Sequence, residues 1–178
     1  MLLSVIVPCY NEEENVPVFY DEMCKNGPFL EREGLELEII YIDDGSKDGT
    51  AAAVRRLHER DPRVHLVSFS RNFGKEAGIY AGFQKAKGDY VVMMDADLQD
   101  PPSLLPEMFS WIRQGYDSVA TRRVNRKGEP PIRSFFARMF YRLMNRISKT
   151  EIVDGARDYR LMTRQVVDGI LSMCEYNR

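Results

Sequence analysis

The stretch that most constrains the fold is residues 90–102, where an apolar run ends in acidic side chains and a double proline. Residues 90–94 predict a core strand of a parallel sheet, and such sheets bind ligands at the carboxyl ends of their strands. Side chains alternate along extended backbone, so Asp95, Asp97 and Gln99 are expected on one side. Their oxygens suit one hard divalent cation, Mg²⁺ or Mn²⁺. The alternative is a polar turn whose aspartates cap a helix that starts near Ser103.

Spacing excludes two other kinds of ion or phosphate site. An EF-hand loop that began at Asp95 would need glycine at its sixth position and glutamate at its twelfth, where the chain has Asp100 and Pro106. Residues 45–50 contain two glycines and a lysine but lack the G-K-[S/T] ending of a phosphate loop. We therefore exclude an EF-hand and a P-loop nucleoside triphosphatase.

Strand-like and helix-like segments alternate along the first two thirds of the chain. Strands are predicted at residues 3–8, 37–42, 64–69, 90–94 and 117–121, with helices between them at about 11–24, 48–60, 75–87 and 103–114. This alternation predicts an α/β fold with a mostly parallel sheet and helices on both faces. Polar sequence follows the strands that end near residues 8, 42 and 94, so these three strand ends are expected to build one site.

The length and the cysteine content narrow the class of protein. A chain of 178 residues, 44% hydrophobic, fits one domain, with an α/β core over residues 1–126 and a helical segment over 127–178 that completes it. Cys9, Cys24 and Cys174 show no paired spacing and accompany only two histidines, so a disulfide framework or zinc site is not expected. No signal peptide or membrane span is recognised, which predicts a soluble or peripheral chain in a reducing compartment.

Positive charge is concentrated in residues 121–149. That segment holds nine Lys or Arg residues against Glu129 alone, a net charge of +8, while the rest of the chain carries −10. Apolar residues recur there at three- and four-residue steps from 132 to 147, which predicts a basic amphipathic helix of the kind that binds anionic headgroups. The alternative, that the apolar stripe packs on the sheet or on a second subunit, stays open. Nucleic-acid binding is not favoured, because the stripe is broad and continuous rather than a row of stacking side chains.

Three motifs together resemble the inverting GT-A glycosyltransferases: residues 8–13 (PCYNEE), 43–50 (DDGSKDGT) and 95–102 (DADLQDPP). Residues 70–78 (SRNFGKEAG) and 158–162 (DYRLM) narrow the resemblance to the polyprenyl-phosphate branch, which includes dolichyl-phosphate mannose synthases and bactoprenol glucosyltransferases. The resemblance spans nearly the whole chain. It implies a GT-A fold, a nucleotide-sugar donor, Mg²⁺ or Mn²⁺, a polyprenyl-phosphate acceptor and work at the cytoplasmic face of the membrane.

The resemblance also implies roles for individual residues. Asp95, Asp97 and Gln99 would hold the metal, and Asp97, Asp158 and Arg160 would act at the reacting centre. The nucleotide would lie against Pro8, Tyr10, Asn11, Glu12, Asp43, Asp44, Lys75, Asp95 and Ala96. A lipid phosphate is largely ionised near neutral pH, so it needs positioning by guanidinium groups more than it needs a base. The candidates for that task are Arg122, Arg123, Arg126 and Arg133.

Several alternatives remain at this stage. The acceptor could be a sugar hydroxyl, for which Asp158 would serve as base, or the chain could be a nucleotide-binding module without catalysis. UDP-glucose is the expected donor, with GDP-mannose next. Many members of this branch continue into transmembrane helices, so the chain is expected to be a catalytic part of a longer protein. Self-association is left open.

Overall fold

The computed structural model describes residues 1–122 and 156–173. The elements in these ranges are β1 (Leu2–Cys9), α1 (Asn15–Cys24), α2 (Gly27–Arg32), β2 (Glu36–Asp43), α3 (Thr50–Arg60), β3 (Val64–Ser68), α4 (Lys75–Lys85), β4 (Tyr90–Met93), the 3-10 turn η1 (Pro102–Leu104), α5 (Leu105–Arg113), β5 (Ser118–Arg122), β6 (Ala156–Thr163) and α7 (Arg164–Ser172). The strands and helices expected before residue 122 are all present, and the short helix α2 was not expected.

The strands form a six-stranded sheet in the order β3-β2-β1-β4-β6-β5. Strand β1 runs parallel to both β2 and β4, and β2 runs parallel to β3. Strand β6 is antiparallel to β4, with Met93 opposite Arg160 and Tyr90 opposite Thr163. The predicted α/β fold with a mostly parallel sheet is confirmed. The expectation of helix throughout residues 127–178 is wrong at 156–163, because these residues complete the sheet as β6.

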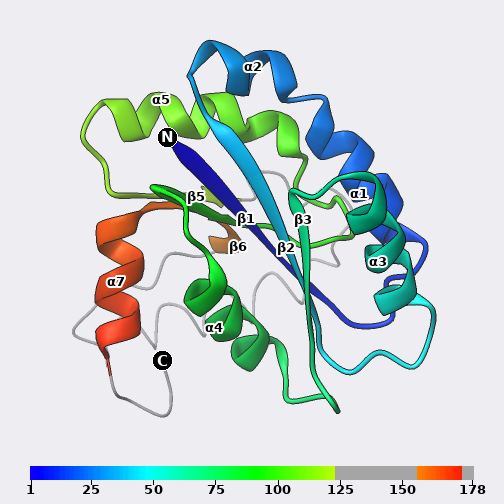
Figure 1. Cartoon of the computed structure of the whole chain (residues 1–178). Coiled ribbons are helices and arrows are strands. Elements are labelled where there is room, and N and C mark those ends of the chain that lie inside the picture. The colour runs from blue at the N-terminus through cyan, green and yellow to red at the C-terminus, as the bar shows by residue number, and fades with distance from the viewer. Residues whose placement is uncertain (123–155, 174–178) are drawn as a thin grey trace, which may run out of the picture. The chain divides into compact units, whose positions relative to one another are not determined.

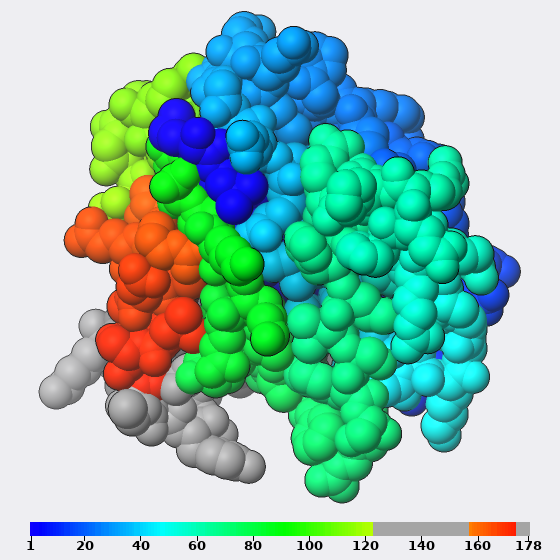
Figure 2. All heavy atoms as spheres, in the orientation of Figure 1, coloured from blue at the N-terminus to red at the C-terminus, as the bar shows by residue number. Residues whose placement is uncertain are grey.

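Helices cover both faces of the sheet (Figure 1). On one face, Leu3, Val5 and Val7 of β1 pack in a buried cluster with side chains from α1, α2, α3 and α5. On the other face, Ile6 of β1 and Ile42 of β2 pack with residues of α4 and α7, two helices that lie side by side in Figure 2. Both faces of the sheet are therefore buried. This explains why the central strands are continuous apolar runs rather than alternating apolar and polar residues.

The chain divides into two compact units. The first comprises Met1–Val119 with Asp158–Arg178, and the second comprises Ala120–Arg157. Most of the basic segment at residues 121–149 lies outside the described residues, including Arg123, Arg126 and Arg133, so its amphipathic helix stays a prediction. Across the ranges 1–122 and 156–173, no helix has the length and apolar character needed to cross a membrane.

Candidate active site

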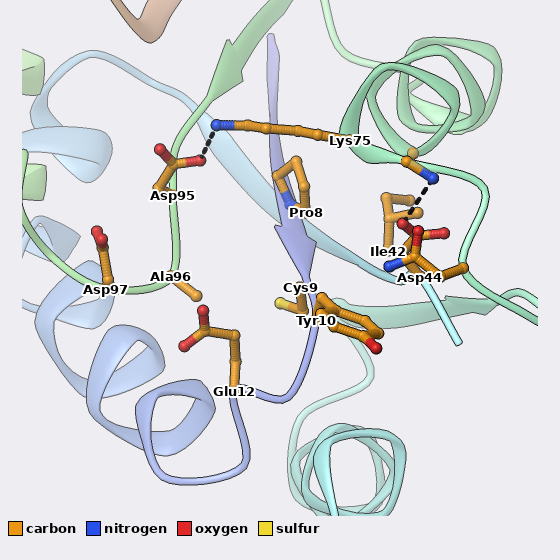
Figure 3. A pocket seen from close by; sticks show the side chains of 13 residues that line it. Pro8, Cys9, Tyr10, Glu12, Ile42, Asp44, Lys75, Asp95, Ala96 and Asp97 are labelled. Atoms are coloured by element: carbon orange, nitrogen blue, oxygen red, sulfur yellow. Dashed lines mark hydrogen bonds and ion pairs between the residues drawn. The ribbon is translucent and has the colours of Figure 1, made fainter. Parts of the chain in front are cut away.

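A pocket of about 370 Å³ opens where β1, β2 and β4 end (Figure 3). Its floor is apolar, with Pro8 and Cys9 from β1 and Ile42 from β2. Its walls come from the polar loops that follow these strands and from the start of α4. The described lining residues are Pro8, Cys9, Tyr10, Glu12, Ile42, Asp44, Asn72, Gly74, Lys75, Gly78, Asp95, Ala96 and Asp97. The volume is in the range of small-ligand sites, and the position matches the general rule for open α/β sheets.

The loops after β1 and β2 are joined by reciprocal hydrogen bonds. The backbone N–H of Asn11 donates to Ser46 Oγ at 2.9 Å, and the N–H of Lys47 donates to Asn11 Oδ1 at 2.9 Å. The N–H of Gly49 donates to Glu13 Oε2 at 2.8 Å. Asn11 therefore ties the two loops together. Its side-chain oxygen accepts a backbone N–H, and Asn11 is not among the described lining residues of the pocket. These hydrogen bonds brace the two loops against each other at the rim of the pocket.

The two adjacent aspartates at the end of β2 have different surroundings. Asp43 is buried, accepting hydrogen bonds from Ser46 N–H at 3.0 Å and Ser68 Oγ at 2.9 Å, and it is not among the lining residues. Asp44 lines the pocket, and its two oxygens accept the N–H groups of Phe73 and Gly74 at 2.7 and 2.9 Å. Asp44 therefore fixes the loop that leads into α4. The charge-assisted bonds explain how a buried carboxylate is tolerated there.

The acidic loop after β4 differs from the extended segment predicted for it. Residues 96 and 97 form a turn, and Leu98 has a positive φ of 57°, so strict alternation of side chains ends at Asp95. Asp95 and Asp97 both line the pocket, whereas Gln99 is exposed and does not. The assumption that one extended run points all three residues to one side was wrong, because the turn interrupts the pleat.

Lys75, the first residue of α4, joins the acidic loop to β6. Its Nζ lies 2.7 Å from Asp95 Oδ1, as drawn in Figure 3, and 2.6 Å from Asp158 Oδ2. The β4–β6 register explains this meeting. The antiparallel pairing ends at Met93 and Arg160, and Asp95 and Asp158 each lie two residues beyond that pair, at the same end of it. Two carboxylates in that relation repel each other, and the ammonium between them offsets the repulsion.

The pocket is strongly acidic. Its described lining carries the carboxylates of Glu12, Asp44, Asp95 and Asp97 against the ammonium of Lys75. Burial, followed by the negative charge of Glu12, raises the pKa of the Cys9 thiol well above its usual range. For Lys75, partial burial alone would lower the pKa, but the hydrogen bonds to Asp158 and Asp95 outweigh it and raise the pKa. Cys9 is therefore a neutral floor residue and Lys75 a stable cation.

The structure brings together most of the residues expected to hold the nucleotide. Those that line the pocket are Pro8, Tyr10, Glu12, Asp44, Lys75, Asp95 and Ala96. Asp97, which was expected at the metal and the reacting centre, also lines it, and Asp158 reaches it through Lys75. Asn11, Asp43 and Gln99 are not among the described lining residues. Arg160 is exposed on β6, and Arg122 is exposed at the end of β5. Lining residues that sequence reasoning missed are Cys9, Ile42, Asn72, Gly74 and Gly78. Cys9, Ile42 and Gly74 lie within two residues of a strand end or of Lys75, which was the available signal. Asn72 and Gly78 each lie three residues from Lys75 and carried no such signal.

Fold and pocket together define an α/β protein with a ligand crevice at the carboxyl edge of its sheet. The family model for Glycosyl transferase family 2 matches residues 4–171, and the chain belongs to this family. It is 41% identical over 177 residues to a Bacillus subtilis (strain 168) glycosyltransferase named CsbB and, over the same length, to the bactoprenol glucosyl transferase of Shigella phage SfV. The matches cover 99% of this chain but only 53% and 57% of those relatives, so the chain spans about half their length.

Solved structures support the same assignment of fold. A mannosyltransferase from Pyrobaculum calidifontis, solved with GDP-Man and Mn²⁺, superposes with a TM-score of 0.64 at 25% identity, over 94% of this chain and 46% of that one. A mannosyl-3-phosphoglycerate synthase from Rubrobacter xylanophilus gives a TM-score of 0.67 at 21% identity, over 93% of this chain and 54% of that one. The predicted GT-A fold and the predicted glycosyltransferase family are both confirmed.

Proposed function

We propose that this chain is the catalytic part of an inverting transferase that moves glucose from UDP-glucose to a polyprenyl phosphate. The pocket at the ends of β1, β2 and β4 is the proposed donor site. The relatives named bactoprenol glucosyl transferase, at 40 to 41% identity, support the acceptor class and the sugar. GDP-mannose is the second candidate donor, because the mannosyltransferase of similar fold was solved with it.

The single observation that carries a metal requirement is the charge of the pocket. A nucleotide diphosphate is an anion, and the described lining presents four carboxylates and one ammonium. Asp95 and Asp97 fit a hard cation, because Mg²⁺ and Mn²⁺ are commonly held by one or two carboxylates together with substrate phosphates. Within the described residues no cluster of three or more His, Cys, Asp or Glu side chains could hold a metal without the substrate. When bound, the metal would stabilise the charge that builds on the diphosphate as the sugar leaves.

The chain's own residues have distinct proposed tasks. The aromatic ring of Tyr10, 43% exposed at the rim, offers a face for the nucleotide base. Asp44 orients the loop that leads into α4, and Lys75 offers its ammonium to the diphosphate of the donor. For the acceptor, Arg160 and Arg122 are exposed guanidinium groups that suit a phosphate. Arg123, Arg126 and Arg133 are proposed for the same task from the sequence.

A polyprenyl phosphate is held in a membrane, so the chain has to work at the bilayer surface. The +8 charge of residues 121–149 supports electrostatic attraction to anionic lipids, which is worth about 1 kcal/mol for each Lys or Arg near the surface. We propose that this segment brings the pocket to the cytoplasmic face.

Calorimetric titration tests donor binding. The purified chain is titrated with UDP, GDP, CDP and dTDP, with and without Mn²⁺, alongside Asp97→Ala. We expect UDP to bind in a metal-dependent manner and to lose at least tenfold in affinity in the variant. Binding of no nucleotide would remove the transferase proposal for this chain.

Transfer is then measured with radiolabelled UDP-glucose and undecaprenyl phosphate in detergent micelles. Label should pass into the lipid phase, and GDP-mannose in place of UDP-glucose should give much less. Label in a water-soluble glycan acceptor instead would favour the hydroxyl-acceptor alternative. Nucleotide binding without transfer to either acceptor would favour a binding module.

A further inference from the structure

Lys75 has a role in the pocket that nucleotide contact alone does not explain. It is the one cationic side chain in the described lining, and its ammonium is shared between Asp95 and Asp158. The side chains of Lys75, Asp95 and Asp158 are 40%, 43% and 56% exposed, so these ion pairs are accessible to solvent and to competing ions. A charge pair in that setting is weak and opens readily.

The backbone before α4 positions Lys75 beside these two carboxylates. Lys75 starts α4 directly after Gly74, whose φ of 95° is in the region that favours glycine. The N–H groups of Phe73 and Gly74 are both held by Asp44, so the turn before the helix is fixed. The ammonium therefore reaches the two carboxylates from a braced helix start. Its position is built into the fold.

We propose, resting on the proposed function above, that Lys75 is a positioning residue that makes metal binding depend on the donor. In the donor-free protein its ammonium neutralises Asp95 and Asp158 and so competes with a divalent cation for Asp95. The diphosphate of an incoming nucleotide offers Lys75 a different anionic partner. Metal and nucleotide then enter together, and Asp158 is released from its ion pair at the same step.

The competition follows from geometry and charge. Asp95 Oδ1 lies 2.7 Å from Nζ, and a Mg²⁺ ion on that oxygen at about 2.1 Å would place two charges of like sign in contact. Lysine must therefore leave Asp95 before the cation binds there. Removing the ammonium should raise the affinity of the nucleotide-free pocket for Mn²⁺ about 1.5- to 5-fold, given the modest strength of such pairs.

The experiment measures Mn²⁺ binding to the nucleotide-free chain by the loss of the free-ion signal in electron paramagnetic resonance. Wild type is compared with Lys75→Met and with Lys85→Met, a matched control that removes an exposed lysine from the last turn of the same helix. Lys75→Met should bind Mn²⁺ about 1.5- to 5-fold more tightly than wild type, and Lys85→Met should match wild type. With saturating UDP, the advantage of Lys75→Met should shrink, because the ammonium then has the diphosphate as its partner.

Equal Mn²⁺ affinity in wild type and Lys75→Met would overturn the proposal, as would an equal gain in Lys85→Met, which would indicate only a change in net charge. These results leave donor binding intact and are distinct from failure of the proposed function, in which wild type binds neither UDP nor Mn²⁺ with UDP. If Lys75→Met does not fold, NMR of the wild-type lysine ammonium groups replaces it. The Lys75 signal should shift with Mg²⁺ and UDP together, and a shift of equal size with Mg²⁺ alone would overturn the proposal.

Discussion

Two glycines of α4 allow a matched test of how this helix, which carries Lys75, is seated on the sheet. A Cβ atom at Gly82 would lie 2.4 Å from Cγ2 of Ile6, a fully buried residue of β1. A Cβ atom at Gly78 would lie 3.5 Å from Cγ2 of Ile42, which is ordinary contact. Gly82→Ala should therefore push the helix from the strand, whereas Gly78→Ala should fill available space.

The magnitude follows from two terms. Replacing glycine by alanine inside a helix stabilises the folded state by about 1 kcal/mol, and this term is common to both variants. Overpacking a buried site by one methyl group costs about 1–3 kcal/mol, and it applies only at Gly82. The free energy of unfolding of the two variants should thus differ by about 2 kcal/mol. For a chain of this size that is a difference of about 4–8 °C in Tm.

Thermal unfolding followed by circular dichroism is the assay, with Gly78→Ala expected at or above the wild-type Tm and Gly82→Ala below Gly78→Ala. UDP titration of both variants reports whether a displaced helix also weakens the pocket. Equal Tm values for the two variants would refute the inferred close contact between Gly82 and Ile6.

Two further predictions concern carboxylates. Asp44→Asn removes the charge that holds the N–H groups of Phe73 and Gly74. The free energy of unfolding measured by chemical denaturation should therefore fall by about 1–3 kcal/mol. An unchanged denaturation midpoint would contradict the bracing role. Hydrogen bonds from Arg63 hold the pKa of Asp61 well below its usual range. This stabilisation is present above the ordinary carboxyl pKa and is lost as the pH falls toward the pKa of the folded state. Between about pH 5 and about pH 2, the free energy of unfolding should therefore fall by about 1–2 kcal/mol more in wild type than in Asp61→Asn. Parallel acid titrations of stability for the two proteins would count against this reasoning.

The sequence predicted which strand ends form the site, but not the side-chain contacts and turns that connect them. The polar residues after β1, β2 and β4 identified three walls of the pocket, because carboxyl ends of parallel strands share one edge. The separate tasks of Asp43 and Asp44 were not predictable, since neighbours in sequence point to opposite faces and meet different partners. Nor was the turn at residues 96 and 97, which separates Gln99 from Asp95.

The sequence by itself determined the family, the α/β class and the acidic character of the site, because hydrophobic periodicity and short motifs are local properties of the chain. Only the tertiary structure decided which charged side chains that are distant in sequence form ion pairs with one another. Strand β6 follows the long segment after β5 and was not expected as a strand, so its antiparallel register with β4 could not be inferred. The pairing of β6 with β4 and the packing of α4 bring Asp158 and Asp95 to the same ammonium, that of Lys75. A pairing across more than sixty residues depends on the whole sheet, and no local pattern encodes it.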